Sequence, residues 1–335
     1  MHVYVIRRLF SLVFVLFGVS VLTFTISHLQ PSDPARFVAG SQATDEQVRQ
    51  IRARLGLDRP LPEQYFRYMT KLLTRGDLGI SMLGRRPVVE ALKDYLPASL
   101  ELALFTLLFA VPLGVALGII SATRAGGVVD FITRLLAIAG VCVPVFFSGL
   151  LLQLLFYGIL DWFPPGGRIS LAMSPPVHIT GLYLIDSMLT ANPAAFVDSL
   201  RHIFLPALTL TLGNLGLITR MTRASILEIL LQDFVRTARA KGLTERVVLT
   251  RHVLKNAFNP VLTVIGLQLA SLIGWMFIVE IVFSWPGIGT YAVRAVMSFD
   301  FEPIMGFVLF MCVIYVVVNL IVDLLYPVFD PRIRY

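Results

Sequence analysis

Charged residues are scarce in this chain of 335 residues, since Asp, Glu, Lys and Arg together make up 15% of it. An ordinary soluble domain contains about 25% charged residues. Apolar residues make up 56%, and the mean hydropathy is +0.79. This composition excludes a soluble globular domain and a disordered chain, and it predicts a polytopic membrane protein. The net charge of +7 does not indicate nucleic-acid binding, because the basic residues flank the apolar runs.

The motifs of several enzyme classes are also missing. None of the four lysines follows a glycine, so the chain has no Walker A loop for ATP. It has no His-Glu-x-x-His, Cys-x-x-Cys or Gly-x-Ser-x-Gly pattern. The two cysteines, Cys142 and Cys312, lie inside apolar runs and indicate no disulfide framework. We therefore expect no enzyme, no catalytic or metal-binding residue and no cofactor held by this chain.

Ionisable residues are absent from the middle of every long apolar run. Glu280 and Asp323 lie only at the ends of such runs, where they can anchor a helix end or pair with a neighbour. Ion-coupled carriers usually keep such groups near the centre of the bilayer. A transporter of this composition is expected to be passive or to take its energy from a partner.

Six apolar runs are long enough to cross a bilayer, which needs about 20 residues. The first follows Arg7 and Arg8, but no small-residue cleavage site follows it, so we expect a retained helix rather than a signal peptide. The six expected spans are Leu9–Ile26, Leu102–Thr123, Leu135–Leu160, Ile203–Thr219, Asn256–Val279 and Pro303–Val322.

Basic residues set the expected orientation of these spans. With the N-terminus inside, the two shorter outer loops carry only Arg168, Arg201 and Arg294. The inner segments then carry Arg7, Arg8, Arg124, Arg134, Arg220, Arg223, Arg236, Arg239, Lys241, Arg246, Arg251, Lys255, Arg332 and Arg334. Both termini are therefore expected in the cytoplasm.

The spans divide the chain into three expected domains. Residues 1–27 form the first transmembrane helix, residues 28–100 an extracytoplasmic helical insert, and residues 101–335 a five-helix core. In the insert, Thr44 and Gln47 form a capping box, and Gly56 can end that helix. A second helix is expected from about Pro62 to Arg75, and a third, short one from Pro87 to before Pro97. The insert is expected to be a cap over the outer mouth, a docking surface for a partner protein, or both.

The inner loop, residues 220–256, carries eight basic and three acidic residues. Ser225 and Glu228 are spaced as a capping box, Gly242 can end a helix, and Thr244 can cap a second one. This predicts two helices separated by a glycine break. The loop either lies on anionic lipid heads or docks into a cytosolic partner.

Residues 236–242, Arg-Thr-Ala-Arg-Ala-Lys-Gly, resemble the EAA loop of binding-protein-dependent ABC importer permeases. Arg236 and Thr237 replace the Glu and first Ala of the general pattern, as they do in its peptide-transporter branch, while Ala238 and Gly242 match it. Other segments resemble the same branch in the same order. They are residues 31–34 (Pro-Ser-Asp-Pro), 55–58, 60–62, 76–79, 285–289 (Trp-Pro-Gly-Ile-Gly) and 330–334.

The resemblance implies an all-α type I ABC importer permease fold with six transmembrane helices, in the bacterial inner membrane. It implies a homologous second permease subunit, two ATP-binding subunits that hold ATP and Mg, and an extracytoplasmic binding protein that delivers dipeptides or oligopeptides. Nickel chelates, glutathione and oligosaccharides are alternative substrates within the family. The ATPase-coupling residues it implies are Arg236, Thr237, Ala238, Arg239, Ala240, Lys241, Gly242, Thr244 and Arg246.

A few polar residues lie within the spans: Gln153, Asn214, Gln268 and Asn319. They can hydrogen-bond between helices or line a translocation path. Ala110, Gly114 and Gly118 are spaced four apart and should allow close helix packing. A self-contained channel or ion-coupled carrier is the alternative from another class, but it accounts for neither the coupling-like loop nor the missing mid-span charges.

Overall fold

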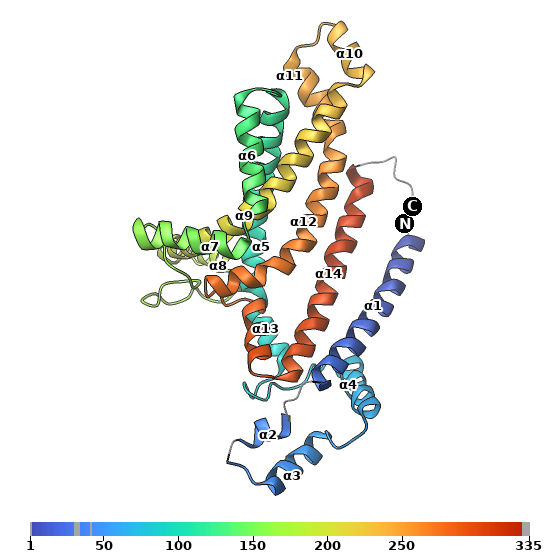
Figure 1. Cartoon of the computed structure of the whole chain (residues 1–335), viewed down its shortest axis with the longest axis vertical. Helices are drawn as coiled ribbons and strands as arrows, with labels where there is room; N and C mark the ends of the chain where they lie inside the picture. The colour runs from blue at the N-terminus through green and yellow to red at the C-terminus, as the bar shows by residue number, and fades with distance from the viewer. Residues whose placement is uncertain (1, 30–33, 41, 330–335) are drawn as a thin grey trace. The chain divides into compact units, whose positions relative to one another are not determined.

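The computed structural model describes the backbone of residues 2–29, 34–40 and 42–329. Within these residues the chain forms fourteen α-helices and two π-helical segments (Figure 1). The only β pairing among them is an isolated bridge between Ile80 and Pro87. The chain divides into two compact units. Unit 1 contains Met1–Pro97 and Pro286–Val317, and unit 2 contains Ala98–Trp285 and Val318–Tyr335.

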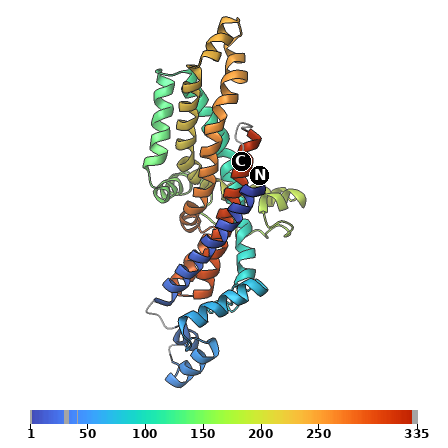
Figure 2. The ribbon, with the colours of Figure 1, turned by 90° about the vertical axis from the view of Figure 1, so that its right-hand side faces the viewer.

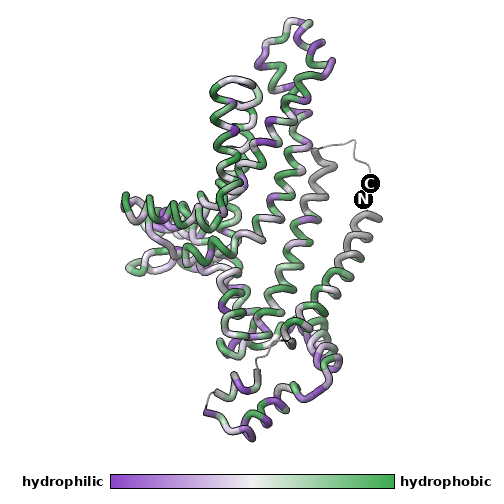
Figure 3. The backbone as a smooth tube through the Cα atoms, viewed as in Figure 1, coloured by the Kyte–Doolittle hydropathy of each residue, from purple (hydrophilic) through white to green (hydrophobic). Residues whose placement is uncertain are grey.

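Six apolar helical segments coincide with the six expected spans. Helices α5 (Val88–Thr123), α9 (Pro193–Leu230) and α14 (Phe301–Phe329) are each long and apolar enough to cross a membrane. Two further candidates are bent pairs, Val128–Cys142 with Val145–Ile159 and Glu245–Leu269 with Gly274–Val282, and α1 (His2–Leu29) contains the shorter apolar stretch Val13–Ile26. The long helices are coloured mostly as hydrophobic in Figure 3. The expected all-α membrane architecture is confirmed.

The helices of the insert begin and end where local signals predict. Helix α3 (Asp45–Leu55) starts with the capping box of Thr44 and Gln47 and ends at Gly56, whose φ is +72°. Helix α4 (Leu61–Arg75) ends at Gly76 with φ +62°, and α2 (Pro34–Ala39) precedes both. Only glycine adopts such left-handed conformations without a steric cost.

The expected short helix between Pro87 and Pro97 is wrong. Helix α5 starts at Val88 and continues through Pro97 to Thr123. A proline removes one intrahelical hydrogen bond, but Val88 and Leu92 are held in a buried cluster with Leu78 and Ile288, so packing keeps the helix intact. The expected boundary at residue 100 therefore falls inside a continuous helix, and the compact units divide after Pro97.

Unit 1 also contains helix α13 (Ile288–Met297) and the first part of α14. The Asp300 carboxylate accepts hydrogen bonds from the Ser81 hydroxyl at 2.7 Å and from the N–H groups of Met82 and Leu83 at 3.1 Å each. These bonds link the loop before α5 to the start of α14. Unit 1 thus joins segments that lie more than 200 residues apart in the sequence.

Unit 2 is built around α9. This helix contacts α6 (Val128–Cys142), α7 (Val145–Gln153), α8 (Tyr183–Leu189) and α12 (Leu254–Val282), as Figures 1 and 2 show. A Cβ atom at Gly118 of α5 would lie 2.4 Å from the Cβ of Thr222, and one at Gly114 would lie 2.7 Å from Ile218. The small residues of α5 therefore serve close packing against α9, as expected.

A sharp bend divides the third span at Pro144. Residues Val128–Cys142 and Val145–Ile159 meet at 103°, and the second part ends in the π-helical segment η1 (Leu154–Ile159). Val143 is extended, with φ −85° and ψ 125°, as expected for a residue before proline. Helices α5 and α9 run on through Pro112 and Pro206.

Candidate functional site

The inner loop forms a compact helical hairpin of α10 (Asp233–Ala240), α11 (Glu245–Val247) and the π-helical segment η2 (Val248–Val253). The expected capping box at Ser225 and Glu228 is wrong, because both residues lie inside α9. Instead, the Ser225 hydroxyl donates to the carbonyl of Ala257 on α12 at 2.8 Å. An N-cap must have non-helical backbone angles, and the packing of α9 keeps this segment helical.

The predicted glycine break is present at Gly242. Its φ is +76°, and its N–H donates to the Arg239 carbonyl at 2.9 Å, while the N–H of Leu243 reaches the Ala238 carbonyl at 3.4 Å. This pair of bonds is the Schellman ending of a helix. Thr244 precedes α11, as predicted, although its side chain makes no capping bond.

The hairpin has a buried apolar side. Val235 is fully buried and Ala238 is 5% exposed. Both pack in one cluster with Ala122, Ile226, Val248, Val253 and Ala257. Ala238 therefore faces the rest of its own chain, so a larger side chain there would push α10 away from its base rather than meet a partner.

The other expected coupling residues are exposed. These are Arg236, Thr237, Arg239, Ala240, Lys241, Gly242, Thr244 and Arg246. The Arg239 guanidinium donates to both carboxylate oxygens of Glu245, at 2.7 and 3.2 Å. This pair bridges the two sides of the glycine turn and, being exposed to solvent, contributes little to stability.

Three large apolar side chains that were not expected to take part are exposed among these charges. Leu231 is 72% exposed, Phe234 41% and Leu243 38%. Figure 3 shows this hairpin as mixed in hydropathy, in contrast to the long helices. An aromatic residue in a basic, solvated loop is the sequence signal that could have identified Phe234, because such residues are favoured anchors at protein interfaces.

An ion pair between buried Asp130 and half-buried Arg223 supports the base of this region. Arg223 of α9 donates to both oxygens of the Asp130 carboxylate, at 2.8 and 2.9 Å. Asp130 also accepts from the Ser121 hydroxyl at 2.5 Å and from the Gly126 N–H at 2.9 Å. The turn between α5 and α6 is thereby fixed to α9, and the Ser225–Ala257 bond fixes α9 to α12. The hairpin therefore rests on helices that these bonds hold together.

The four expected path residues have different surroundings. Asn214 of α9 accepts from the Gln268 amide of α12 at 3.0 Å, so these two lie together between helices. The Gln153 amide donates to the carbonyls of Pro165 and, at 3.1 Å, Val282, and so holds a loop in place. Asn319 is half-buried on α14. The structure thus brings together two of the four.

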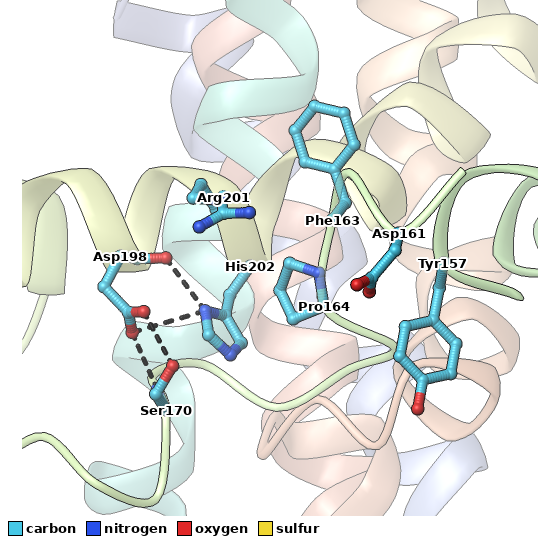
Figure 4. Close-up of a pocket in the computed structure, with 8 residues that line it drawn as sticks. All are labelled: Tyr157, Asp161, Phe163, Pro164, Ser170, Asp198, Arg201 and His202. Carbon is cyan, nitrogen blue, oxygen red and sulfur yellow. Dashed lines mark hydrogen bonds and ion pairs between the residues drawn. The ribbon is translucent and has the colours of Figure 1, made fainter. Parts of the chain in front are cut away.

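A polar pocket lies at the other end of α9 (Figure 4). Its volume is about 160 Å³, and it is lined by Tyr157, Asp161, Phe163, Pro164, Ser170, Asp198, Arg201 and His202. Asp198 accepts from the N–H and hydroxyl of Ser170, at 2.7 and 2.6 Å, and lies 3.4 Å from the ring of buried His202. These bonds attach the loop after η1 to α9.

The long apolar helices, their bends and the charged helical hairpin are the features of a membrane-embedded permease. The family of binding-protein-dependent transport system inner membrane components matches residues 114–335, and the N-terminal model of the same membrane component matches residues 1–103. The chain belongs to this family.

Three relatives are similar over nearly their whole length. The probable D,D-dipeptide transport system permease protein DdpB of Escherichia coli K12 is 46% identical, covering 98% of this chain and 96% of the relative. The dipeptide transport system permease protein DppB of Alkalihalophilus pseudofirmus is 41% identical, covering all of both chains. The glutathione transport system permease protein GsiC of Escherichia coli O6:H1 is 37% identical, covering 99% of each.

Membership identifies the chain as a permease subunit of an ABC importer with the type I fold, in the inner membrane, which it crosses several times. It is not an enzyme, because ATP hydrolysis in these systems is carried out by a separate subunit. Its partners include ATPase and binding-protein components. The expected family, fold and function are confirmed.

Proposed function

We propose that this chain carries dipeptides or short oligopeptides across the bacterial inner membrane, coupled to ATP hydrolysis through the hairpin of α10 and α11. The observation that carries the proposal is the two-sided structure of this hairpin. Val235 and Ala238 anchor one side to the chain's own helices, while Phe234 and the basic residues are exposed on the other. A loop that only connects two spans does not need a helical hairpin with one buried and one exposed side.

The exposed side offers both kinds of contact that a protein interface requires. Phe234, Leu231 and Leu243 provide apolar contact area, and Arg236, Lys241 and Arg246 provide positive charge. An apolar centre with a charged rim is the usual anatomy of such interfaces. We assign this side to a cleft of an ATP-binding subunit with acidic residues at its edge.

Rigid attachment of the hairpin turns movement of the ATPase into movement of the spans. When ATP draws two ATP-binding subunits together, the hairpin is displaced with them. The Asp130–Arg223 pair and the Ser225–Ala257 bond pass that displacement to α6, α9 and α12. Rocking of a packed helix block between two arrangements then alternates the side on which the path is open. The complete machine has a homologous second permease and two ATP-binding subunits, which hold ATP and Mg.

The orientation follows from the distribution of basic residues. The hairpin and both termini lie in the cytoplasm, whereas the insert and the loop around α8 lie outside. A binding protein on the outer side delivers the peptide, and Asn214 and Gln268 are the polar residues we assign to the path. Gln153 and Asn319 remain predicted path residues of the same kind.

The substrate assignment rests on relatives described as dipeptide permeases at 46% and 41% identity. Glutathione is the second candidate, because GsiC is similar over 99% of its length. Most of the selection is expected to reside in the binding protein, so the permease sequence favours the broader class of short peptides.

Co-purification and transport test this proposal together. The chain is isolated from its native membrane in mild detergent, its partners are identified by mass spectrometry, and the complex is placed in liposomes with its binding protein. We expect a second permease, two ATP-binding chains, and ATP-dependent uptake of labelled dipeptides. Uptake of glutathione but not dipeptides would change the substrate, and ATP-independent transport by the isolated chain would refute the coupling.

A further inference from the structure

Helix α4 belongs to the insert that the sequence analysis placed outside the membrane, yet it contacts the first span well below that span's outer end. The Tyr65 and Ser20 hydroxyls are 2.6 Å apart. Tyr65 also forms edge-on contacts with Phe17 and Phe24, with ring centroids at 6.4 and 5.3 Å. Ser20 lies six residues before Ile26, which is about 9 Å along a helix.

The sixth span gives a second, independent measure of depth. Leu72 of α4 packs on a buried cluster against which Phe307 and Phe310 of α14 also pack. A cavity of about 150 Å³ is lined by Tyr68 and Lys71 of α4 together with Phe301 and Met305 of α14. Met305 lies two residues inside the expected span that starts at Pro303, which is about 3 Å along a helix. Measured against the two expected spans, α4 lies near their outer ends, where headgroups meet acyl chains.

One flank of α4, beside the side that makes these contacts, is apolar. Phe66 is 73% exposed and Leu73 is 78% exposed. They are seven residues apart, so they share one face of the helix. On α1, which contacts α4 through Tyr65, Phe17 and Leu22 are likewise 58% and 63% exposed. Exposed Phe and Leu side chains at this depth are next to lipid rather than water.

The remaining edge of α4 is basic. Arg67, Lys71 and Arg75 are exposed and recur every four residues, so they form one row along the helix. Glu63 pairs with Arg67 at 3.7 Å, which leaves a net positive edge. A helix with an apolar face and a row of Lys and Arg is typical of elements that lie in the membrane interface.

We propose that α4 is an interfacial helix that binds the outer leaflet, with Phe66 and Leu73 among the acyl chains and the basic edge directed at phospholipid phosphates. The second half of the insert is then part of the membrane-embedded protein, and α2 and α3 form its water-exposed part. Lipid contact on α4 fixes the orientation of α1, because the two helices share the Tyr65 contact. Only the assignment to the outer leaflet uses the N-in orientation proposed above.

Spin-label accessibility tests the proposal on the complete importer in liposomes. Cys142 and Cys312 are first replaced by alanine. Single nitroxide labels are then attached through Phe66→Cys and Leu73→Cys, with Thr74→Cys on the polar side of α4 and Gln50→Cys on exposed α3 as matched controls. Relaxation by oxygen, which concentrates in lipid, is compared with relaxation by a water-soluble nickel chelate.

We expect oxygen to dominate at positions 66 and 73 and the nickel chelate to dominate at positions 74 and 50. Dominance of the chelate at 66 and 73 would overturn the proposal in favour of a soluble cap. If neither reagent relaxes the labels at positions 66 and 73, another protein covers this face and the proposal is wrong. If the labelled chains do not assemble, Phe66→Trp and Thr74→Trp replace them, and we expect lipids with brominated chains to quench the added emission only at position 66.

Discussion

Arg168 and Glu101 form a buried ion pair, in which the Nε and Nη2 groups of the arginine donate to one carboxylate oxygen at 2.9 and 2.6 Å. The second oxygen accepts the Leu184 N–H at 2.7 Å, and the guanidinium lies 3.7 Å from the centre of the Tyr183 ring. The side chains are only 8% and 5% exposed. This pair attaches α8 and the loop before it to the start of the apolar part of α5.

Removing one member of this pair should destabilise unit 2 strongly. Arg168→Met leaves a buried carboxylate without its cation, and we expect a loss of about 3–5 kcal/mol in the free energy of unfolding. Chemical unfolding in detergent micelles measures it. The exposed Arg201→Met is the control and should change the same quantity by less than about 1 kcal/mol. Equal effects of the two changes would show that the buried pair has no special role.

Peptide uptake should depend on the left-handed backbone conformation of Gly242 and should tolerate a larger side chain at this position. Gly242→Pro cannot adopt the φ of +76° and removes the N–H that bonds Arg239, so we expect peptide uptake to be lost while the chain stays in the membrane. Gly242→Asn should retain most uptake, because asparagine tolerates this conformation and a Cβ here meets no atom within 4 Å. Normal uptake by the proline variant would contradict the coupling role of the turn.

Ala238 and Ala240 form a matched pair, one buried and one exposed on the same helix. Ala238→Leu should overpack the cluster beneath α10 and cost about 1–3 kcal/mol, with a corresponding loss of ATP-driven uptake. Ala240→Leu adds the same atoms where they meet no part of this chain, so hairpin stability should not change. Hydrogen exchange of residues 233–253 distinguishes the two. Equal protection in both variants would argue against the buried position of Ala238.

Phe234 should be an energetic anchor for the ATP-binding subunit. Phe234→Ala removes the largest exposed aromatic of α10, and we expect weaker association by about 2 kcal/mol or more. Phe234→Tyr keeps the ring and should bind nearly as well. Co-purification of the ATP-binding subunit at increasing detergent or salt measures the difference. Unchanged association of Phe234→Ala would move the interface elsewhere.

Asp186 should make the outer loop sensitive to acid. Burial alone raises the pKa of this carboxyl, but hydrogen bonds from the Thr180 hydroxyl and from the N–H groups of Thr180, Ile179 and Gly181 outweigh it and lower the pKa below its usual value. The stabilisation is therefore complete above the pKa of an unfolded aspartate, about 3.9, and disappears as pH falls through the lower pKa of the folded state.

The measurement is hydrogen exchange of residues 177–190 between pH 6 and 3, corrected for the intrinsic rate. We expect protection to fall with acid in the native chain and to be lower and nearly independent of pH in Asp186→Asn. Asp161→Asn, which alters a carboxylate in the same outer loop, should leave the profile unchanged. A flat profile in the native chain would show that the ionised form of Asp186 does not hold this loop.

Local signals in the sequence were sufficient for much of the fold. The apolar runs located the long apolar helices, because each span must present about 20 residues to lipid. Among the described residues, three helices are long and apolar enough by themselves, and up to five candidates result if each bent pair counts as one span. The capping box at Thr44 and the ends at Gly56 and Gly242 were predictable because each depends on the geometry of a few adjacent residues. The helical hairpin at residues 233–253 was located by its basic composition and its resemblance to the EAA loop.

Other features depended on residues that are distant in the sequence. Pairing of Glu101 with Arg168 and of Asp130 with Arg223 cannot be predicted from periodicity, because any of several charged residues at helix ends could have met. Ala238 and Ala240 are the same residue type on the same helix, and only the structure shows that the first is buried and the second exposed. Helix α5 continues through Pro97, where a proline is expected to end a helix, because its first residues pack in a buried cluster.

The sequence by itself determined that this chain is a helical membrane protein without an energy site of its own, since composition and missing motifs do not depend on the path of the chain. Tertiary structure alone decided which ionic groups are buried together, which side of α10 is exposed and how deep α4 lies beside α1. The physical reason is that solvation and packing energies depend on neighbours in space, and the chain brings those neighbours together only when it folds.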